Sequence, residues 1–297
     1  MTAKEPLVSV YLPTHNRAML LTRAIESVLC QTFTNFELIV VDDGSTDTTP
    51  EILEHLVARD SRITVLRTGR SQGAPVARNI AIHAAKGTYL TGIDDDDEMQ
   101  PTRLHELLKA FRPEFSLISS SAVRKTPEWS TILHAGTKII HLDDLLYRNI
   151  VGTQALTLRD RVVTLGGFDA DFKASQDYDL WIRLVEKYGP AKRIGSPSYV
   201  IHEHASASRI SDQKLVGAQQ IIAKHGRIMS ARHLQSRQLE MLMMSNKNLN
   251  LIDLVKLANR ENIAQAGRYF VTCRLPWLRR VANRLRRATS AKPAHRD

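Results

Sequence analysis

Cysteine is scarce in this sequence of 297 residues, which contains only Cys30 and Cys273. The two cysteines stand far apart in the chain and fit no spacing that is typical of a metal or redox motif. A metal or redox site built on cysteine is therefore excluded. Cys30 falls within a helical pattern of apolar residues, so we expect its thiol to be buried.

Long apolar runs are also missing. No stretch approaches the roughly 20 consecutive apolar residues that a membrane-spanning helix needs. The N-terminal residues do not combine a basic region with a long apolar run, so no secretory signal peptide is expected. Both absences predict a cytoplasmic protein.

The charge of the chain is unevenly distributed. The composition is ordinary for a globular protein, with 43% hydrophobic and 24% charged residues, yet the formal net charge is +10. Residues 211–297 contain 17 Lys and Arg against 5 Asp and Glu, whereas residues 1–210 contain 24 against 26. We therefore predict a near-neutral domain over 1–210 and a separate basic, helical region over 211–297.

Strand and helix patterns alternate along the first third of the chain, which is typical of an α/β protein with a parallel, doubly wound sheet. The expected strands are Leu7–Leu12, Glu37–Val41, Ile63–Leu66 and Tyr89–Gly92, and the expected helices begin near Ala18, Thr46 and Pro75. The later elements are a helix from Pro101 to Phe111, a strand at Phe115–Ser119, short strands with a helix at Leu142–Tyr147, a helix from Gln176 and a strand at Tyr199–Ile201.

Four consecutive carboxylates, Asp94–Asp97, directly follow an apolar, β-prone run that begins at Tyr89 and predicts a buried strand. Four like charges in a row repel one another, so a cation is expected there, most simply a divalent metal. Oxygen ligands without a nearby cysteine favour Mg²⁺ or Mn²⁺ over zinc. The alternative is a solvated acidic turn. Polar clusters also end two other strands, at Thr14–Arg17 and Asp42–Ser45, and all three should line one crevice at the carboxyl edge of the sheet.

With these elements placed, residues Pro6 to Ser211 resemble a family 2 glycosyltransferase of the GT-A type. The resemblance depends on five segments in order, which are Val8–Arg17, Val40–Asp47, Ala77–Asn79, Ile93–Asp97 and Gln176–Trp181. It implies a mostly parallel sheet flanked by helices. It also implies inverting transfer of a sugar from a nucleotide-diphosphate donor, with a UDP-sugar favoured, to a hydroxyl of a glycan or lipid-linked acceptor in cell-surface polysaccharide synthesis.

The resemblance also implies roles for single residues in donor binding. The DxD motif of the family falls on Asp94–Asp96. Asp96 would ligate Mn²⁺ or Mg²⁺, which stabilises a departing diphosphate as a Lewis acid, and Asp94 would contact the ribose or the water shell of the metal. Asp43 would accept a hydrogen bond from the base. The remaining residues that the resemblance places at the donor are Pro13, His15, Arg17, Arg78, Asn79 and Asp95.

Asp177 matches the catalytic base of the family, which takes the proton from the acceptor hydroxyl. The family usually has Glu-Asp here, and Gln176 in this chain puts the acceptor contacts in question rather than the base. The alternatives are that Asp177 is a helix N-cap, or that Asp179 is the base. His204 resembles a further metal ligand of some relatives, with His202 beside it, although either could be an ordinary histidine. Trp181 is predicted to be a core residue rather than a platform for a sugar.

The basic region predicts two helices, Ile221–Leu242 and Leu249–Phe270, and then an amphipathic segment at Pro276–Arg287. In that segment Trp277, Leu278, Val281 and Leu285 share one side and arginines the other, as in an interfacial membrane helix. Peripheral contact with the inner face of the cell membrane would suit a lipid-linked acceptor. The alternative is a solvated basic tail.

Two other functions use similar features. A nucleotidyltransferase or phosphatase could use the acidic strand end, but the sequence has no glycine-rich phosphate loop with lysine, and Glu98 after Asp97 breaks the DxDxT pattern of a phosphatase nucleophile. A nucleic-acid-binding protein could use the basic tail, but its basic residues do not interleave with aromatics and the acidic crevice would repel phosphate. We therefore predict no nucleic-acid partner.

Overall fold

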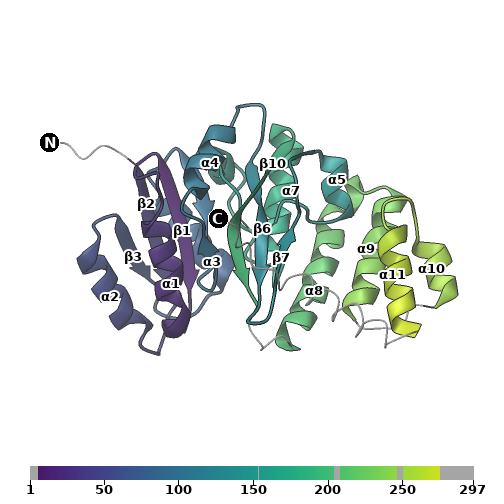
Figure 1. The fold of residues 1–297 in the computed structure, drawn as a ribbon, viewed down its shortest axis with the longest axis horizontal. Helices are drawn as coiled ribbons and strands as arrows, with labels where there is room; N and C mark the ends of the chain where they lie inside the picture. Colours follow the sequence, from purple (N-terminus) through teal and green to yellow (C-terminus); the bar gives the residue numbers. More distant parts are fainter. Residues whose placement is uncertain (1–5, 153, 204–207, 246–249, 275–297) are drawn as a thin grey trace, which may run out of the picture.

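The computed structural model describes residues 6–152, 154–203, 208–245 and 250–274. Figure 1 shows two neighbouring sheets flanked by helices, followed by a row of helices at one end of the molecule. No helix among these residues is both long enough and apolar enough to cross a membrane.

The first sheet confirms the parallel arrangement expected from the sequence. Its strand order is β3-β2-β1-β4-β9, and its first four strands are parallel. Only the two-residue edge strand β9 runs antiparallel, against β4. The strands are β1 (Val8–Thr14), β2 (Phe36–Asp42), β3 (Ile63–Arg67), β4 (Tyr89–Gly92) and β9 (Thr157–Leu158), and the connecting helices are α1 (Ala18–Leu29), α2 (Thr49–Arg59) and α3 (Ala74–Ala84).

The second sheet is mixed, so the α/β fold contains two sheets rather than one doubly wound sheet. Its order is β5-β10-β6-β7, with β8 paired to β10, and only β10 and β6 run parallel. The strands are β5 (Glu98–Met99), β6 (Ile118–Lys125), β7 (Ser130–Leu133), β8 (Lys138–Ile140) and β10 (Ala191–His202). The helices of this part are α4 (Arg103–Ala110), α5 (Leu142–Tyr147), α6 (Arg159–Thr164) and α7 (Gln176–Tyr188).

Two buried apolar clusters cover the two faces of the first sheet. Along β1, Val8 and Val10 face one cluster and Tyr11 faces the other, because successive side chains of a strand point to opposite faces. The first cluster contains α1 and α4 residues, and the second contains α3 and α7 residues. Burial on both faces explains why these strands are continuous apolar runs. Trp181 is 1% exposed within the second cluster, as predicted for a core residue.

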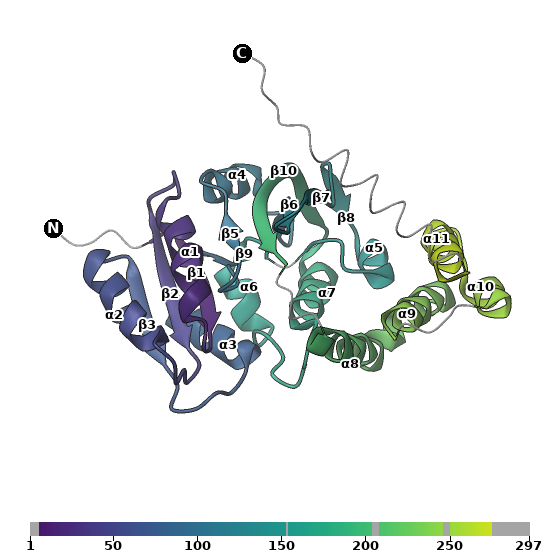
Figure 2. The same ribbon diagram turned by 60° about the horizontal axis from the view of Figure 1, so that its bottom comes forward.

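The C-terminal region is helical, as predicted, but its helices are shorter than expected. The predicted helix Ile221–Leu242 is interrupted after His225, where Gly226 begins a short 3₁₀ turn. Figure 2 shows these helices following one another away from the second sheet. They are α8 (Ser208–His225), η1 (Gly226–Ile228), α9 (Ala231–Met244), α10 (Leu251–Leu257) and α11 (Ile263–Arg274).

The predicted boundary at 210/211 coincides with no break in the core. Ile221 of α8 is fully buried in the same cluster as Trp181, whereas Leu239 and Ala266 form a small separate cluster farther along the chain. The division into two domains stays a prediction.

Two local expectations were wrong. Cys30 is exposed, because it lies at the last turn of α1, outside the buried stripe of that helix. The strand expected at Phe115–Ser119 begins only at Ile118 and continues to Lys125, because its partner β10 is long. The amphipathic segment Pro276–Arg287 lies outside the described residues.

Candidate active site

An open cleft lies at the carboxyl ends of β1, β2 and β4. The three polar clusters that end these strands gather there, as expected for parallel strands that finish at one edge. The empty volume of the cleft, open solvent included, is about 1080 Å³. Its lining includes Pro13, Thr14, His15, Arg17, Asp43, Ser71, Gly73, Ala74, Ala77, Arg78, Asp94, Asp95, Asp96 and Gln213.

Asp94 is bonded to residues from distant segments of the chain. Its Oδ1 accepts hydrogen bonds from Arg78 at 2.8 Å and from Gln154 Nε2 at 3.1 Å. Its backbone N–H donates to the hydroxyl of Tyr199 at 3.2 Å. Gln154 in turn accepts a bond from the hydroxyl of Tyr11 at 3.1 Å. Asp94 is therefore held in place by groups from three separate segments of the chain, and Tyr11 holds one of them, Gln154.

The neighbouring carboxylates repel one another. Burial, together with the charges of Asp96 and Asp94, raises the pKa of Asp95 to about 6, although Arg17 lies 3.7 Å away and opposes the shift. Burial, followed by the same two charges, raises the pKa of Asp97 to about 8. Four carboxylates crowded together in this way favour the binding of a cation.

The donor set of this cleft fits a hard divalent cation, because it consists of carboxylate oxygens that repel one another. Within the described ranges, no group of three or more His, Cys, Asp and Glu is arranged as a metal site. The predicted ligand Asp96 lines the cleft, and its backbone carbonyl accepts a bond from Arg23. The other predicted ligand, His204, lies outside the described residues.

Asp43 is anchored by the loop that leads into α3. Its carboxylate accepts bonds from the N–H groups of Gln72 and Gly73 at 2.9 and 2.7 Å, and from the hydroxyls of Ser71 and Thr68 at 2.9 and 3.0 Å. Burial alone would raise the pKa of Asp43, but these four donors outweigh it and lower the pKa. Asp43 thus holds the loop 71–73 against the cleft, and its hydrogen bond to the nucleobase of a donor stays a prediction.

His15 is oriented by the backbone of Asp43. Its Nδ1 lies 2.8 Å from the Asp43 carbonyl, which can only accept, so Nδ1 carries the proton. Its Nε2 accepts a bond from the amide nitrogen of Asn16 at 3.1 Å. The side-chain oxygen of Asn16 accepts from the N–H of Thr46 at 2.8 Å, which fixes the orientation of the amide. The His15 ring is therefore held in one tautomer at the rim of the cleft.

Asp177 lies in the first turn of α7, beside the cleft. The N-cap of α7 is Ser175, so the alternative that Asp177 is the N-cap residue is wrong. Burial raises the pKa of Asp177 to about 6, against the opposing charge of Arg78, and the charge of Asp94 adds to the rise. A carboxylate with this pKa is a stronger base than a solvated one and is still mainly ionised at pH 7.

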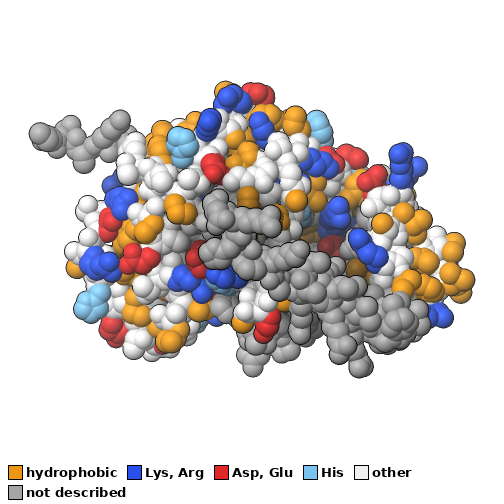
Figure 3. All heavy atoms as spheres, in the orientation of Figure 1, with side chains coloured by type: hydrophobic (Ala, Val, Ile, Leu, Met, Phe, Trp, Pro, Cys, Tyr) orange, Lys and Arg blue, Asp and Glu red, His pale blue; other side chains and the backbone are white. Residues whose placement is uncertain are grey.

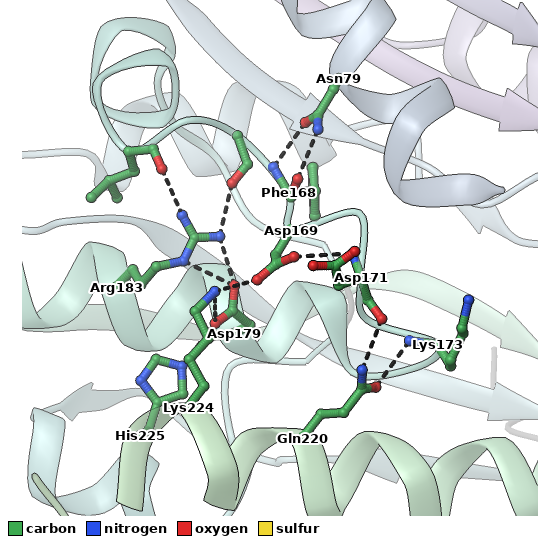
Figure 4. A network of polar contacts seen from close by, with 12 residues as sticks. Asn79, Phe168, Asp169, Asp171, Lys173, Asp179, Arg183, Gln220, Lys224 and His225 are labelled. Atoms are coloured by element: carbon green, nitrogen blue, oxygen red, sulfur yellow. Dashed lines mark hydrogen bonds and ion pairs between the residues drawn. The ribbon is translucent and has the colours of Figure 1, made fainter. Parts of the chain in front are cut away.

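Asp179 has the opposite environment, although it lies only two residues farther along α7. Its side chain is fully buried and meets three cationic or polar groups, as Figure 4 shows: Arg183 at 2.7 Å, Lys224 at 2.9 Å and His225 at 2.8 Å. These partners outweigh the effect of burial and lower the pKa of Asp179 to about 2. So weak a base, enclosed in an ionic network, does not suit proton transfer from an acceptor.

The same network fastens α8 to the catalytic part of the chain. Lys224 also pairs with Asp169 at 2.6 Å, and Gln220 bonds with the backbone of Asp171 and Lys173. A Cβ at Gly217 would lie 2.7 Å from the carbonyl oxygen of Ala174, so α8 approaches this loop too closely for any larger residue. The attachment brings Gln213 of α8 to the lining of the cleft.

Two other predicted residues have partners away from the cleft. The carboxamide of Asn79 makes two bonds with the backbone of Phe168, at 2.7 and 2.8 Å, and Asn79 is not among the residues that line the cleft. His202 Nε2 lies 2.6 Å from the carboxylate of Glu98. The backbone N–H of His202 donates to the carboxylate of Asp97 at 3.1 Å. Burial and the charge of Arg23 lower the pKa of His202 despite the Glu98 carboxylate.

Sequence reasoning missed Tyr11, Gln154, Tyr199 and Gln213. Tyr11 lies within a predicted strand. Because side chains alternate along a strand, its position next to Val10 indicated only that the two side chains point to opposite faces of the sheet. No local pattern marks the other three, because they reach the site from distant segments through the tertiary fold.

The comparisons with known proteins agree with this geometry. The sequence profile described as Glycosyl transferase family 2 matches residues 9–169. The protein assigned to colanic acid biosynthesis as glycosyl transferase WcaA, from Escherichia coli (strain K12), is 36% identical over 232 residues, which cover 74% of this chain and 81% of that protein.

Two solved structures share the fold. The structure of S. aureus TarS 1–349 has a TM-score of 0.61 at 18% identity and covers 90% of this chain and 80% of its own. The mannosyltransferase PcManGT from Pyrobaculum calidifontis, solved with GDP-Man and Mn²⁺, has a TM-score of 0.57 at 21% identity and covers 97% and 82%. Fold and site together define a glycosyltransferase of the GT-A type. Within that class, the chain belongs to Glycosyl transferase family 2.

Proposed function

We propose that this protein is an inverting, metal-dependent glycosyltransferase. It would move a sugar from a nucleoside diphosphate to a hydroxyl of a glycan or of a lipid-linked acceptor. The observation that carries the proposal is that Asp94, Asp95 and Asp96 line one cleft together with Arg78, and that the charges of Arg78 and Asp94 also act on Asp177. Family membership favours this reaction over nucleotidyl transfer, phosphate hydrolysis and nucleic-acid binding.

The donor nucleotide would occupy the part of the cleft between β1 and β2. Pro13, His15, Arg17 and Asp43 line this part and would hold the nucleoside. TarS has been solved with UDP and with UDP-GlcNAc, and PcManGT with GDP-Man, so both uridine and guanosine donors occur on this fold. A UDP-sugar is our favoured donor.

The diphosphate would lie near Arg78 and the acidic run. Arg78 is buried, and two of its guanidinium nitrogens make no hydrogen bond to the described residues, so they can donate to phosphate oxygens. Asp96, with Asp94 beside it and His204 as a candidate, would hold Mn²⁺ or Mg²⁺. Such a cation supplies Lewis-acid stabilisation of the leaving diphosphate. Asn79 would act indirectly, by fixing the Phe168 turn whose ring lies against Arg78.

Asp177 would be the general base. Its ionised carboxylate would accept the proton of the acceptor hydroxyl as that oxygen forms a bond to the anomeric carbon. The bond from this carbon to the diphosphate breaks in the same step, on the opposite face, which inverts the configuration. The raised pKa of Asp177, about 6, suits this role because the group stays ionised at neutral pH while binding a proton more strongly than a solvated carboxylate.

The biological setting would be the synthesis of a cell-surface polysaccharide in the cytoplasm, at the inner face of the membrane. The name of the relative WcaA supports the polysaccharide part. The membrane part is supported by the arginines of Pro276–Arg287 and by three exposed apolar residues of α10, Leu251, Ile252 and Val255, which are 60%, 64% and 74% exposed. In Figure 3 apolar side chains gather at the end of the molecule that α10 occupies.

A thermal-shift screen of nucleoside diphosphates tests the proposal. UDP together with Mn²⁺ should raise the Tm by more than the sum of the two separate shifts, because binding to the native state alone stabilises it. Release of UDP from UDP-sugars should then require Mn²⁺ or Mg²⁺. If no nucleoside diphosphate shifts the Tm with or without metal, the proposal fails.

A further inference from the structure

A second pocket borders the first on the side of the second sheet. It is formed by β6, β7, β10 and the loop before β9, and its empty volume is about 640 Å³, open solvent included. The residues that matter for its chemistry are Arg103, Arg124, His134, Asn149, Gln154 and Tyr199. None of these residues belongs to the cleft that we assign to the donor.

The two pockets meet at Asp94. Gln154 and Tyr199 line the second pocket, and both are hydrogen-bonded to Asp94, which lines the first. The loop before β9, which contains Gly152 and Gln154, is also bonded to α7, the helix that contains Asp177. Trp181 Nε1 of this helix donates to the Gly152 carbonyl at 3.0 Å. A group bound in the second pocket would therefore lie on the far side of Asp94 from the nucleotide, where an acceptor has to approach.

The floor of this pocket contains a buried arginine that makes no hydrogen bond to a carboxylate of the described residues, although the charge of Glu106 acts on it. Arg103 is 0% exposed and donates to the hydroxyls of Ser120 and Ser198 at 2.6 and 3.2 Å and to the Gln154 carbonyl at 3.0 Å. All three acceptors are neutral, and the Nε of Arg103 makes no hydrogen bond to the described residues. A buried charge is costly unless an opposite charge compensates it, so this arginine leaves a positive potential in the pocket.

Other cations strengthen this potential. Arg193 is 6% exposed, and its bonds are to the backbone carbonyls of Gly136 and Ile150. Partial burial, followed by the charges of Arg193, Arg148 and Arg124, lowers the pKa of His134, as a positive surrounding should. Arg124 pairs with Glu203 at 3.4 Å, but that carboxylate is half exposed and neutralises only one of these arginines.

We propose that this second pocket binds an anionic group of the acceptor, a carboxylate or a phosphate, and that it selects acidic acceptors. The inference rests on the proposed function, since it needs a glycosyl acceptor beside Asp94. A carboxylate would come from an acidic sugar, and a phosphate from the lipid carrier of a lipid-linked acceptor. Arg124 and His134 would contact the anion, with Arg103 supplying charge beneath it. A neutral sugar would gain nothing from this arrangement.

Two matched pairs of probes separate these sources. Methyl β-glucuronide and methyl β-glucoside differ only in a carboxylate, and geranyl diphosphate and geraniol differ only in a diphosphate. The full-length protein is titrated with each probe by calorimetry or ligand-observed NMR, without metal. We expect at least one anion to bind tenfold or more tightly than its neutral partner, and the pair that shows the preference identifies the source.

A double variant, Arg124→Gln with His134→Asn, should reduce that preference to less than twofold. Asparagine suits position 134, because the backbone there has φ of 54° and asparagine tolerates the left-handed region. The matched control is Arg59→Gln, which removes an equal charge at a distant site. Arg59 ends α2 and forms an exposed ion pair with Glu26 of α1. Equal binding of both members of both pairs, or a preference that survives the double variant, overturns the inference. Binding of UDP with Mn²⁺, measured on the same samples, shows separately whether the proposed function holds.

Discussion

Asp177 and Asp179 show how strongly the surroundings determine the chemistry of a residue. Both are aspartates in the first turn of α7, two positions apart. Around Asp177 the effect of burial outweighs the charge of Arg78, so its pKa rises to about 6. The other faces α8, where three partners reach it and its pKa falls to about 2. The structure thus favours Asp177 over Asp179 as the general base.

Asp177→Asn should separate binding from chemistry. Asparagine has the same size and can still accept from the N–H groups of the first turn, so stability and donor affinity should barely change. The amide cannot take a proton at neutral pH, and loss of a positioned base typically lowers the rate by ~10²–10⁴-fold. Transfer to an acceptor is measured beside UDP binding, with the exposed Asp160→Asn as control. Transfer at the wild-type rate would show that the base lies elsewhere.

The pH dependence of transfer should show the same group. Because the pKa of Asp177 is raised to about 6, the base is ionised above that pH and becomes protonated below it. We therefore expect the rate at saturating donor to fall about tenfold for each pH unit below 6, and the residual rate of Asp177→Asn to lack this limb. If the rates of both proteins fall at the same pH, the titrating group is not Asp177.

Asp96→Ala tests the metal site. The change removes a predicted ligand at the edge of the cleft and takes nothing from the apolar core, so the fold should persist. Calorimetric titration with Mn²⁺ and UDP should show loss of the metal-dependent part of the affinity. Glu186→Ala, an exposed acid on the far end of α7, is the control. Wild-type affinity in Asp96→Ala would refute the assignment of this ligand.

At the scale of elements, α8 belongs structurally to the catalytic part of the chain. It is attached to α7 by the buried ionic network of Asp179, and its Ile221 completes the apolar core. The attachment also brings Gln213 to the cleft, so the helix contributes to the site as well as to stability. The boundary predicted from charge, at 210/211, falls inside this helix, since net charge reports on the surface and the contact between α7 and α8 is buried.

Asp179→Asn should destabilise the protein by ~1.5–3 kcal/mol, because it weakens the charge-assisted bonds from Arg183, Lys224 and His225 to this buried side chain. The pKa of Asp179 lies below the ordinary value, so its charge stabilises the fold fully above about pH 4, and this contribution is lost as the pH falls toward 2. Urea unfolding of both proteins from pH 7 to pH 2 measures this. The difference between them should shrink below pH 4, and a difference independent of pH would argue against an ionic role.

At the scale of the whole molecule, the C-terminal part of the sequence combines an excess of basic residues with exposed apolar side chains on α10. The C-terminal region contains the excess of arginine and lysine, and the outer face of α10 exposes Leu251, Ile252 and Val255. Apolar side chains beside basic ones are the combination that holds a protein at an anionic membrane surface. Residues at the carboxyl edge of the first sheet line the cleft, and Figure 1 shows this sheet at the opposite end of the molecule from α10, so membrane binding and donor binding should be separable.

Deleting residues 276–297 should release the protein from vesicles that contain anionic lipid. The deletion removes Lys292 and six arginines, which are Arg279, Arg280, Arg284, Arg286, Arg287 and Arg296, and each basic residue near an anionic surface contributes on the order of 1 kcal/mol. Ile252→Ser with Val255→Ser should weaken sedimentation further, and Val57→Ser on α2 should not. Unchanged sedimentation after the deletion would remove the membrane proposal, whereas UDP binding should stay the same in every variant.

The candidate site could be predicted only in part. Asp94–Asp97, Asp43 and His15 were predictable, because each follows a recognisable strand and parallel strands end at one edge of a sheet. Gln154 and Tyr199 were not, since the strand pattern at Tyr199–Ile201 gives no sign of a partner and both residues reach Asp94 by tertiary contact. Asn79 was predicted at the donor, yet its carboxamide is bonded to the Phe168 backbone, a contact 89 residues along the chain that no local signal reveals.

The sequence by itself determined the elements of this protein and the edge where its chemistry lies. Hydrophobic alternation and turn residues act over a few positions, so the strands β1 to β4, the helix Leu142–Tyr147 and the acidic run were all predictable locally. Only the tertiary structure decided that two sheets form, that Cys30 faces solvent, that α8 closes one side of the core, and that a buried Arg103 lies beneath a second pocket. These features depend on which distant segments exclude water from one another, and burial of that kind is a property of the folded chain rather than of any stretch of sequence.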